Sequence, residues 1–120
     1  MFKKLNKNLK LNKPDAVLID TDNTLYDYAP ANQKALIASK NKLNNLLGVN
    51  ESDFFRLYRQ ARIEIKKELG DVASSHSRLL YFQRLIELLG FKAQLMIALD
   101  LEQTFWRTFL ANAPLFPGVK

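Results

Sequence analysis

Two aspartates, Asp20 and Asp22, are separated by one residue and followed by Thr24. Alternate residues of an extended chain project to the same side, so both carboxylates can face one site while Thr21 turns away. Two such carboxylates repel each other unless a cation joins them, and Mg²⁺ commonly shares one or two carboxylates with a substrate phosphate. A carboxylate can also attack phosphorus while a second one transfers the leaving-group proton. The spacing therefore indicates metal-assisted phosphoryl transfer, with Asp20 and Asp22 as candidate catalytic residues and metal ligands.

An uninterrupted apolar run, residues 16–19, directly precedes Asp20. A short aliphatic run of this kind is typical of a strand that is covered on both faces in a parallel sheet. In open α/β sheets, ligands bind beyond the carboxyl ends of the strands. The sequence therefore predicts a core strand that places the two aspartates at such an edge.

The segment DTDNTLYD, residues 20–27, together with the apolar run before it, resembles the first motif of the haloacid-dehalogenase-like (HAD) hydrolases. It looks most like the branch of nucleotide and sugar-phosphate phosphatases. The resemblance implies that Asp20 is the nucleophile and Asp22 the general acid/base, with Mg²⁺ held by the Asp20 carboxylate and the Asp22 backbone carbonyl. It also implies an α/β, Rossmann-like core for the parent protein and phosphate-binding roles for Thr21 and Thr24.

Two other interpretations of the aspartates compete with this one. An EF-hand calcium loop needs glycine at its sixth position and glutamate at its twelfth. Leu25 and Ala31 occupy those positions, which excludes such a loop. A polar turn with capping aspartates stays open as an alternative, because Asp and Asn are common in turns after strands.

The remaining sequence predicts four amphipathic helices joined by short turns, which is typical of a helical bundle. They are expected at about residues 31–47, 51–69, 75–89 and 92–112. The residues that mark the helix ends are Gly48, an Asn50 cap, Gly70, a cap at Ser74 or Ser75, and Gly90. Their apolar stripes are Leu36, Leu43 and Leu47; Phe54, Tyr58, Ala61, Ile65 and Leu69; Leu79, Phe82, Ile86 and Leu89; and Leu95, Leu99, Trp106 and Phe109.

In the family that the motif resembles, such a bundle is inserted after the first motif as a cap over the active site. The expected organisation is a basic tail (1–13), the first core strand and Asp loop (14–27), a helical cap (28–112) and a return to the core (113–120). Arg78 is a candidate substrate contact. A surface or capping role is expected for His76, because one isolated histidine makes no metal site.

The net charge of +6 is concentrated in residues 1–13, which hold five lysines and no acid. This pattern favours a solvated leader, so nucleic acid is not an expected partner. The chain has no cysteine, no apolar signal region and no run long enough to span a bilayer, so a soluble cytoplasmic protein is expected without a membrane partner. The oligomeric state is not indicated.

The function expected is hydrolysis of a phosphorylated small molecule, a nucleotide or sugar phosphate, by an Mg²⁺-dependent phosphatase. The later family motifs, namely a Ser or Thr, a phosphate-binding lysine and an acidic pair, have no counterpart in the 120 residues. The chain is therefore expected to be an N-terminal fragment that is inactive alone. Two alternatives stay open: a helical interaction module with a vestigial Asp loop, and a phosphate- or nucleic-acid-binding adaptor.

Overall fold

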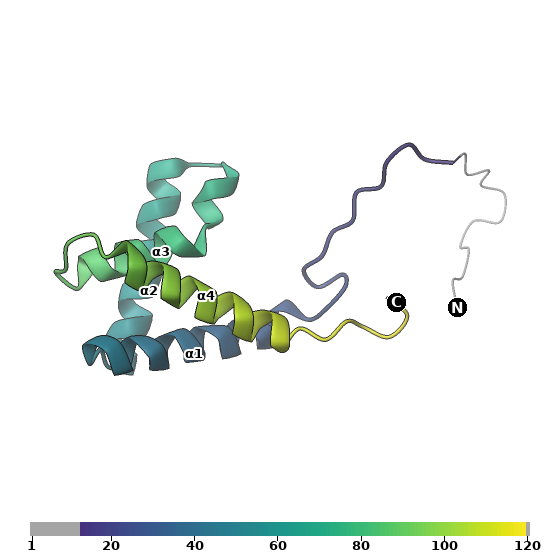
Figure 1. The fold of residues 1–120 in the computed structure, drawn as a ribbon. Coiled ribbons are helices and arrows are strands. Elements are labelled where there is room, and N and C mark those ends of the chain that lie inside the picture. The colour runs from purple at the N-terminus through teal and green to yellow at the C-terminus, as the bar shows by residue number, and fades with distance from the viewer. Residues whose placement is uncertain (1–12, 120) are drawn as a thin grey trace.

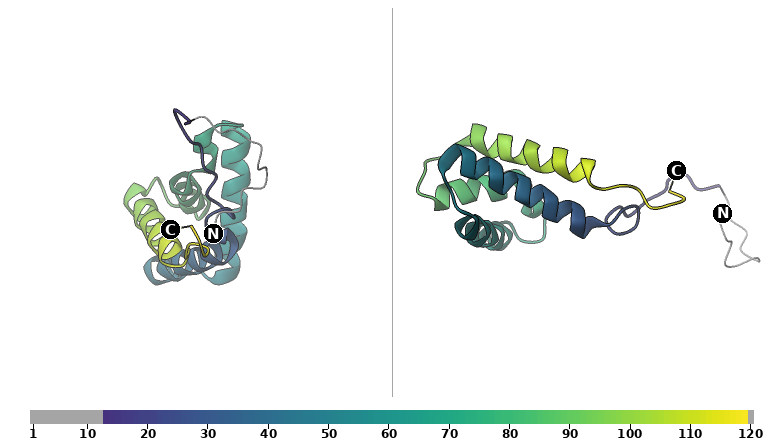
Figure 2. Two further views of the ribbon diagram at one scale, coloured as in Figure 1. Left: turned by 90° about the vertical axis from the view of Figure 1, so that its right-hand side faces the viewer. Right: turned by 90° about the horizontal axis from the view of Figure 1, so that it is seen from below.

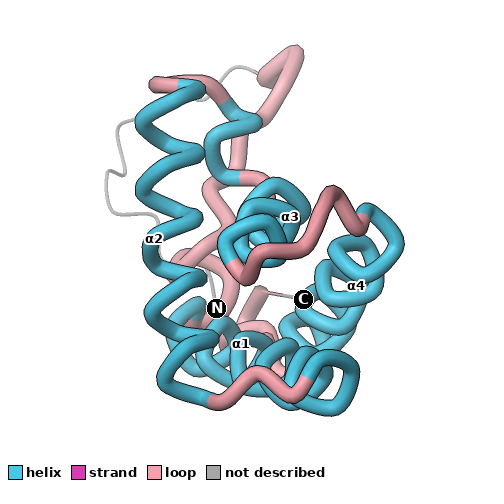
Figure 3. The backbone as a smooth tube through the Cα atoms, turned by 90° about the vertical axis from the view of Figure 1, so that its left-hand side faces the viewer, coloured by secondary structure: helices cyan, strands magenta, loops and turns pink. Residues whose placement is uncertain are grey.

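The computed structural model describes residues 13–119, which fold as four α-helices and one short 3₁₀ turn (Figure 1). The elements are α1 (Tyr28–Leu47), α2 (Glu51–Leu69), η1 (Ala73–His76), α3 (Arg78–Leu88) and α4 (Leu95–Ala111). Helix α1 packs along α4, and α3 lies between α2 and α4 (Figures 2 and 3). The prediction of a four-helix bundle is confirmed. The predicted basic tail falls, apart from Lys13, outside the described residues, as does Lys120.

The helix ends follow from local sequence signals. Gly48 closes α1 in the left-handed conformation, with φ of +68°, and its N–H donates to the Asn44 carbonyl over 2.7 Å. The Asn50 side chain accepts a hydrogen bond from the Asp53 N–H over 2.9 Å, which confirms the predicted cap of α2. Gly70 stands at the end of α2 as predicted.

Helix α3 begins at Arg78, so the prediction of a start at Ser74 or Ser75 is wrong. Ser77 is the cap, and its hydroxyl accepts from the Leu80 N–H over 3.4 Å. Ser75 is buried instead: its hydroxyl donates to the Val72 carbonyl over 2.7 Å, and its own carbonyl accepts from the Tyr81 hydroxyl over 2.6 Å. These two bonds hold η1 as a separate turn ahead of α3.

Two other helix starts also differ from the prediction. Helix α1 begins three residues earlier, at Tyr28, because Pro30 is tolerated in a first turn, where the N–H groups have no intrahelical partner. Helix α4 begins at Leu95 rather than near Lys92. The N–H groups of Gly90 and Phe91 bond back to the carbonyls of Glu87 and Ile86, so this part of the chain completes the end of α3.

The core is built from one face of each helix, but on every helix the buried residues differ in part from the predicted stripe, most clearly on α1 and α4. Helix α1 buries small side chains against α4, and Leu36 and Leu47 are only partly buried. The small residues allow close approach of α1 to α4, and the buried Ser39 hydroxyl is satisfied by the Ala35 carbonyl at 3.0 Å. On α4, two residues of the predicted stripe are exposed, Leu95 by 52% and Trp106 by 40%. The buried residues are Ala31, Ala35, Ser39 and Leu43 on α1, and Ala98, Leu101, Phe105 and Phe109 on α4.

Residues 16–19 do not form the predicted strand. Val17 and Ile19 are 68% and 64% exposed, and Leu18 is fully exposed. A strand requires a neighbour that accepts and donates its backbone hydrogen bonds, and no strand is formed anywhere in residues 13–119. The single strand predicted at residues 16–19 is therefore wrong, whereas the α/β core is a prediction for the parent protein that these residues do not test. In this same range no helix combines the length and the apolar character needed to cross a membrane.

Candidate active site

The Asp loop, residues 20–27, is held by a set of short-range hydrogen bonds. The Thr24 hydroxyl donates to the Asp20 carboxylate over 2.5 Å. The backbone N–H groups of Thr24 and Leu25 both donate to the Thr21 carbonyl, over 3.2 and 2.9 Å. The chain therefore turns immediately after Asp20, and one carboxylate oxygen of Asp20 is fixed by Thr24.

Asn23 links this loop to the first helix of the bundle. It adopts a positive φ of 60°, a conformation that asparagine tolerates better than most residues. Its side-chain oxygen accepts a hydrogen bond from the Tyr28 N–H over 3.1 Å, at the first turn of α1. The formal cap residue of α1, Asp27, makes no side-chain cap bond. Asn23 thus supplies the capping oxygen from within the Asp loop.

This contact can be tested by replacing Asn23. We expect Asn23→Gly to speed amide hydrogen exchange at Tyr28 by about fivefold, because one such hydrogen bond contributes roughly 1 kcal/mol. Asn23→Ala is expected to speed it further, since alanine is also strained in the left-handed conformation. Hydrogen exchange followed by NMR measures both variants, and the amide of Phe54 at the capped start of α2 serves as an internal control. Unchanged exchange at Tyr28 in both variants would show that the loop and α1 are not coupled.

Tyr26 connects Asp22 to the bundle and to the segment after α4. Its hydroxyl donates a hydrogen bond to the Asp22 carboxylate, which raises the pKa of Tyr26 because the carboxylate stabilises the neutral phenol. Its ring packs edge-on against Phe109 of α4, with centroids 5.8 Å apart. Next to it, the Phe116 N–H donates to the Leu25 carbonyl over 2.8 Å. Sequence reasoning missed Tyr26, and its position four residues after Asp22 is the signal that could have found it.

A cavity of about 380 Å³ opens beside Asp22, between the Asp loop and the bundle. It brings together three of the predicted site residues, Thr21, Asp22 and Arg78. Asp20 and Thr24 do not line this cavity; they bond to each other beside it. The aromatic lining was not predicted as part of the site. The other lining residues are Tyr26, Tyr28, His76, Trp106 and Phe109.

Arg78 is fixed beside this cavity by contacts to both polar and aromatic groups. One guanidinium nitrogen donates to the Tyr28 hydroxyl over 2.7 Å, and another donates to the His76 carbonyl over 3.1 Å. Cation–π contacts favour a charge held over an aromatic face. The guanidinium carbon lies 5.6, 5.1 and 5.9 Å from the ring centroids of Tyr81, Phe105 and Trp106. The side chain is therefore positioned before any anion arrives.

The donor set at the loop fits part of a magnesium site. Mg²⁺ is usually bound by one or two carboxylates, waters and substrate phosphate. Asp20 and Asp22 offer two exposed carboxylates, each with one oxygen engaged by a neighbouring hydroxyl. Over residues 13–119, no three acidic or histidine side chains come together as a metal-binding group. The two aspartates can thus hold such an ion only with further ligands.

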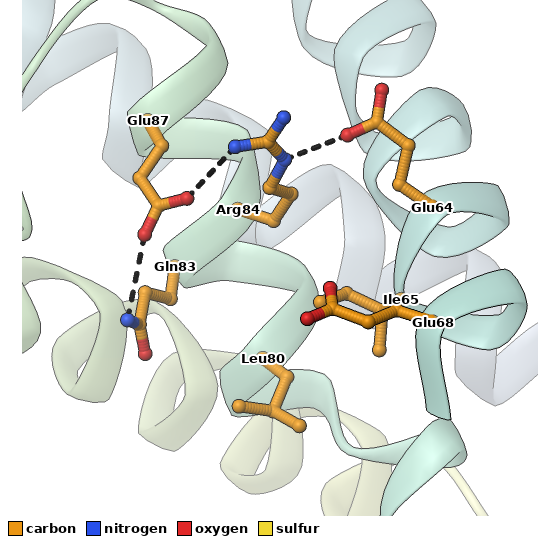
Figure 4. A pocket seen from close by; sticks show the side chains of 7 residues that line it. All are labelled: Glu64, Ile65, Glu68, Leu80, Gln83, Arg84 and Glu87. Carbon is orange, nitrogen blue, oxygen red and sulfur yellow. Dashed lines mark hydrogen bonds and ion pairs between the residues drawn. The ribbon is translucent and has the colours of Figure 1, made fainter. Parts of the chain in front are cut away.

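A second cavity, of about 480 Å³, lies between α2 and α3 and shares no residue with the Asp loop (Figure 4). Its cation, Arg84, is already paired with Glu64 at 2.6 Å and with Glu87 at 3.0 Å. Hydrogen bonds from Gln60 and Arg84 lower the pKa of Glu64. This cavity is therefore the site of an internal ion-pair network, and the candidate site is the one beside Asp22.

Comparison with known proteins shows similarity to a phosphatase. The chain is 37% identical over 106 residues to the ribulose-1,5-bisphosphate 5-phosphatase of Halopiger xanaduensis. This match covers 88% of the chain and 44% of the relative, so the chain spans less than half of that protein's length. No protein-family model and no solved structure matches the chain. The chain that carries the Asp20–Asp22 loop is thus similar in sequence to part of a phosphatase.

Proposed function

We propose that these residues form the nucleophile loop and the helical cap of an Mg²⁺-dependent, HAD-like phosphatase. The observation that carries the proposal is that Asp22 of the Asp loop and Arg78 of the helical bundle line the same cavity. The similarity to a phosphatase supports the same conclusion.

In the proposed reaction, a carboxylate oxygen of Asp20 attacks the phosphorus of a phosphomonoester. The bond from phosphorus to the ester oxygen breaks, and Asp22 gives its proton to the departing alcohol. The product of this step is an aspartyl-phosphate. Water then attacks its phosphorus while the Asp22 carboxylate takes the proton, and inorganic phosphate leaves with Asp20 restored.

The neighbouring groups suit these roles. The Thr24 hydroxyl holds one Asp20 oxygen and leaves the other for attack, and Tyr26 holds Asp22 on the cavity side. Mg²⁺, bound by the Asp20 carboxylate and the Asp22 backbone carbonyl, would neutralise charge on the phosphoryl oxygens. The aromatic wall at Trp106 would limit water around the ester, as the closing cap of such an enzyme requires.

The substrate proposed is a phosphorylated small molecule. Between a nucleotide and a sugar phosphate, we favour the sugar phosphate, because the name of the Halopiger relative gives a sugar bisphosphate as its substrate. The phosphate-binding lysine and the additional acidic ligands expected in this family would correspond to the part of the relative that the match does not cover.

The test is a phosphatase assay of two forms of the protein. The 120-residue chain with para-nitrophenyl phosphate and Mg²⁺ is expected to give no turnover above a metal-only blank, because within residues 13–119 no ion pair fixes a cation beside Asp20 to stabilise the phosphoryl charge. A form that adds the equivalent of the relative's remaining length is expected to release phosphate, and EDTA is expected to abolish the release. Turnover by the 120 residues that depends on Asp20 would contradict the proposal that further residues are needed to complete the active site. No turnover by the longer form would contradict the function.

A further inference from the structure

We propose that Arg62 and Arg78, the latter positioned by Tyr28, form a second anion-binding subsite, which holds a non-reacting phosphate or carboxylate of the substrate. This inference rests on the proposed function, in which the Asp loop handles the reacting phosphate. It narrows the substrate class to phosphomonoesters that carry a second anionic group.

The subsite is a small cavity of about 120 Å³ that adjoins the one beside Asp22. Helices α1, α2 and α3 all contribute to it. Tyr28 and Arg78 line both cavities, so they form a shared wall between the Asp loop and Arg62. The two cavities therefore border the same two side chains, as a substrate with two anionic groups would require. The lining residues of the small cavity are Tyr28, Asn32, Leu36, Tyr58, Arg62 and Arg78.

The charge at this cavity is uncompensated. It is lined by two arginines and by no acidic residue. The ion pairs formed within residues 13–119 lie elsewhere, and none of them includes Arg62 or Arg78. These pairs are Lys40–Glu51, Lys42–Asp100, Arg56–Asp53, Arg84–Glu64 and Arg84–Glu87. An anion that enters the cavity therefore meets positive charge without having to displace a carboxylate.

Arg78 also carries an unused donor. Its Nε is buried and has no hydrogen-bond partner. Buried donors are nearly always paired, so an unpaired one calls for an acceptor that the described part of the chain does not provide. Phosphate and carboxylate groups match the guanidinium fork in both charge and geometry. This donor is closed off in the structure, so a bound anion would supply its acceptor after a small shift of the Arg78 side chain.

The charges of Arg62 and Arg78 both reach Tyr58, which also lines the small cavity. Burial raises the pKa of Tyr58 to about 12, while the charges of Arg78 and Arg62 oppose that rise. The Tyr28 hydroxyl accepts from Arg78 over 2.7 Å and donates its own hydrogen to the Asn32 side-chain oxygen over 3.0 Å, so it positions the Arg78 guanidinium and is not itself a donor to the anion. Donors that are already ordered lose little freedom when a ligand binds.

The test compares two sugars that differ by one phosphate, fructose 1,6-bisphosphate and fructose 6-phosphate, binding to the 120-residue chain. Calorimetry gives the dissociation constants, and NMR follows the Nε–H signals of Arg62 and Arg78. We expect the bisphosphate to bind about tenfold more tightly, as one charge-assisted contact allows. Arg62→Gln should remove most of that difference. Arg59→Gln, three residues earlier on α2 and outside both cavities, is the matched control and should leave it within about twofold.

Arg78→Lys provides a second variant that keeps the charge and removes the planar fork, so it should also weaken the preference for the bisphosphate. Equal binding of the two sugars, or equal effects of Arg59→Gln and Arg62→Gln, would overturn the subsite. The subsite is thus judged by binding alone, whereas the proposed function is judged by turnover.

Discussion

Asp20→Asn is expected to lower phosphatase turnover by about a thousandfold or more in the form of the protein that shows activity. The substitution keeps the size and shape of the side chain but replaces the attacking carboxylate oxygen with an amide. It also weakens the proposed Mg²⁺ site, to which the same carboxylate contributes. The Thr24 hydroxyl can still donate to the remaining side-chain oxygen, so the loop should keep its conformation. Steady-state kinetics and circular dichroism measure the two effects separately.

Asp15→Asn is the matched control for this experiment. Asp15 is exposed and lies five residues before Asp20, outside the hydrogen-bonded loop. The same chemical change there should leave turnover within about twofold, since an isolated surface charge has little effect. Activity of Asp20→Asn within a few-fold of wild type would exclude Asp20 as the nucleophile.

The parts of the fold that could be predicted are those set by neighbouring residues. Asn50 and Gly48 mark helix ends through bonds that span only three or four residues, and the structure contains both. The apolar periodicity predicted four helices for the same reason. The predicted start of α3 is wrong because Ser75, a good cap by type, is turned inward by its bond to the Val72 carbonyl.

The parts that could not be predicted depend on distant contacts. Helix α1 faces α4 through Ala31 and Ala35, and the preference for small residues there reflects the close approach of a helix far away in sequence. The candidate site shows the same limit. Arg78 is a predicted substrate contact, but its bond to the Tyr28 hydroxyl joins residues 50 positions apart. Sequence spacing alone carries no signal for that pair.

Phe82→Ala is expected to destabilise the bundle by about 3–5 kcal/mol, the usual cost of removing a buried aromatic ring. Phe82 is fully buried on α3, and its ring lies 5.5 Å from that of Tyr58 on α2 and 6.3 Å from that of Phe105 on α4. A domain of this size has a total stability of roughly 5–15 kcal/mol, so the melting temperature should fall by about 15 °C or more. Thermal unfolding followed by circular dichroism gives this value.

Phe91→Ala makes the same chemical change at a residue that is 44% exposed in the connection between α3 and α4, and it should cost less than about 1 kcal/mol. The Phe82→Ala variant is also expected to affect the candidate site, through Phe105. Phe105, which Phe82 supports, is the ring closest to the Arg78 guanidinium, at 5.1 Å. Loss of Phe82 should therefore loosen Arg78 and weaken anion binding even at temperatures where the helices persist. Similar melting temperatures for the two variants would show that α2, α3 and α4 do not share one core around Phe82.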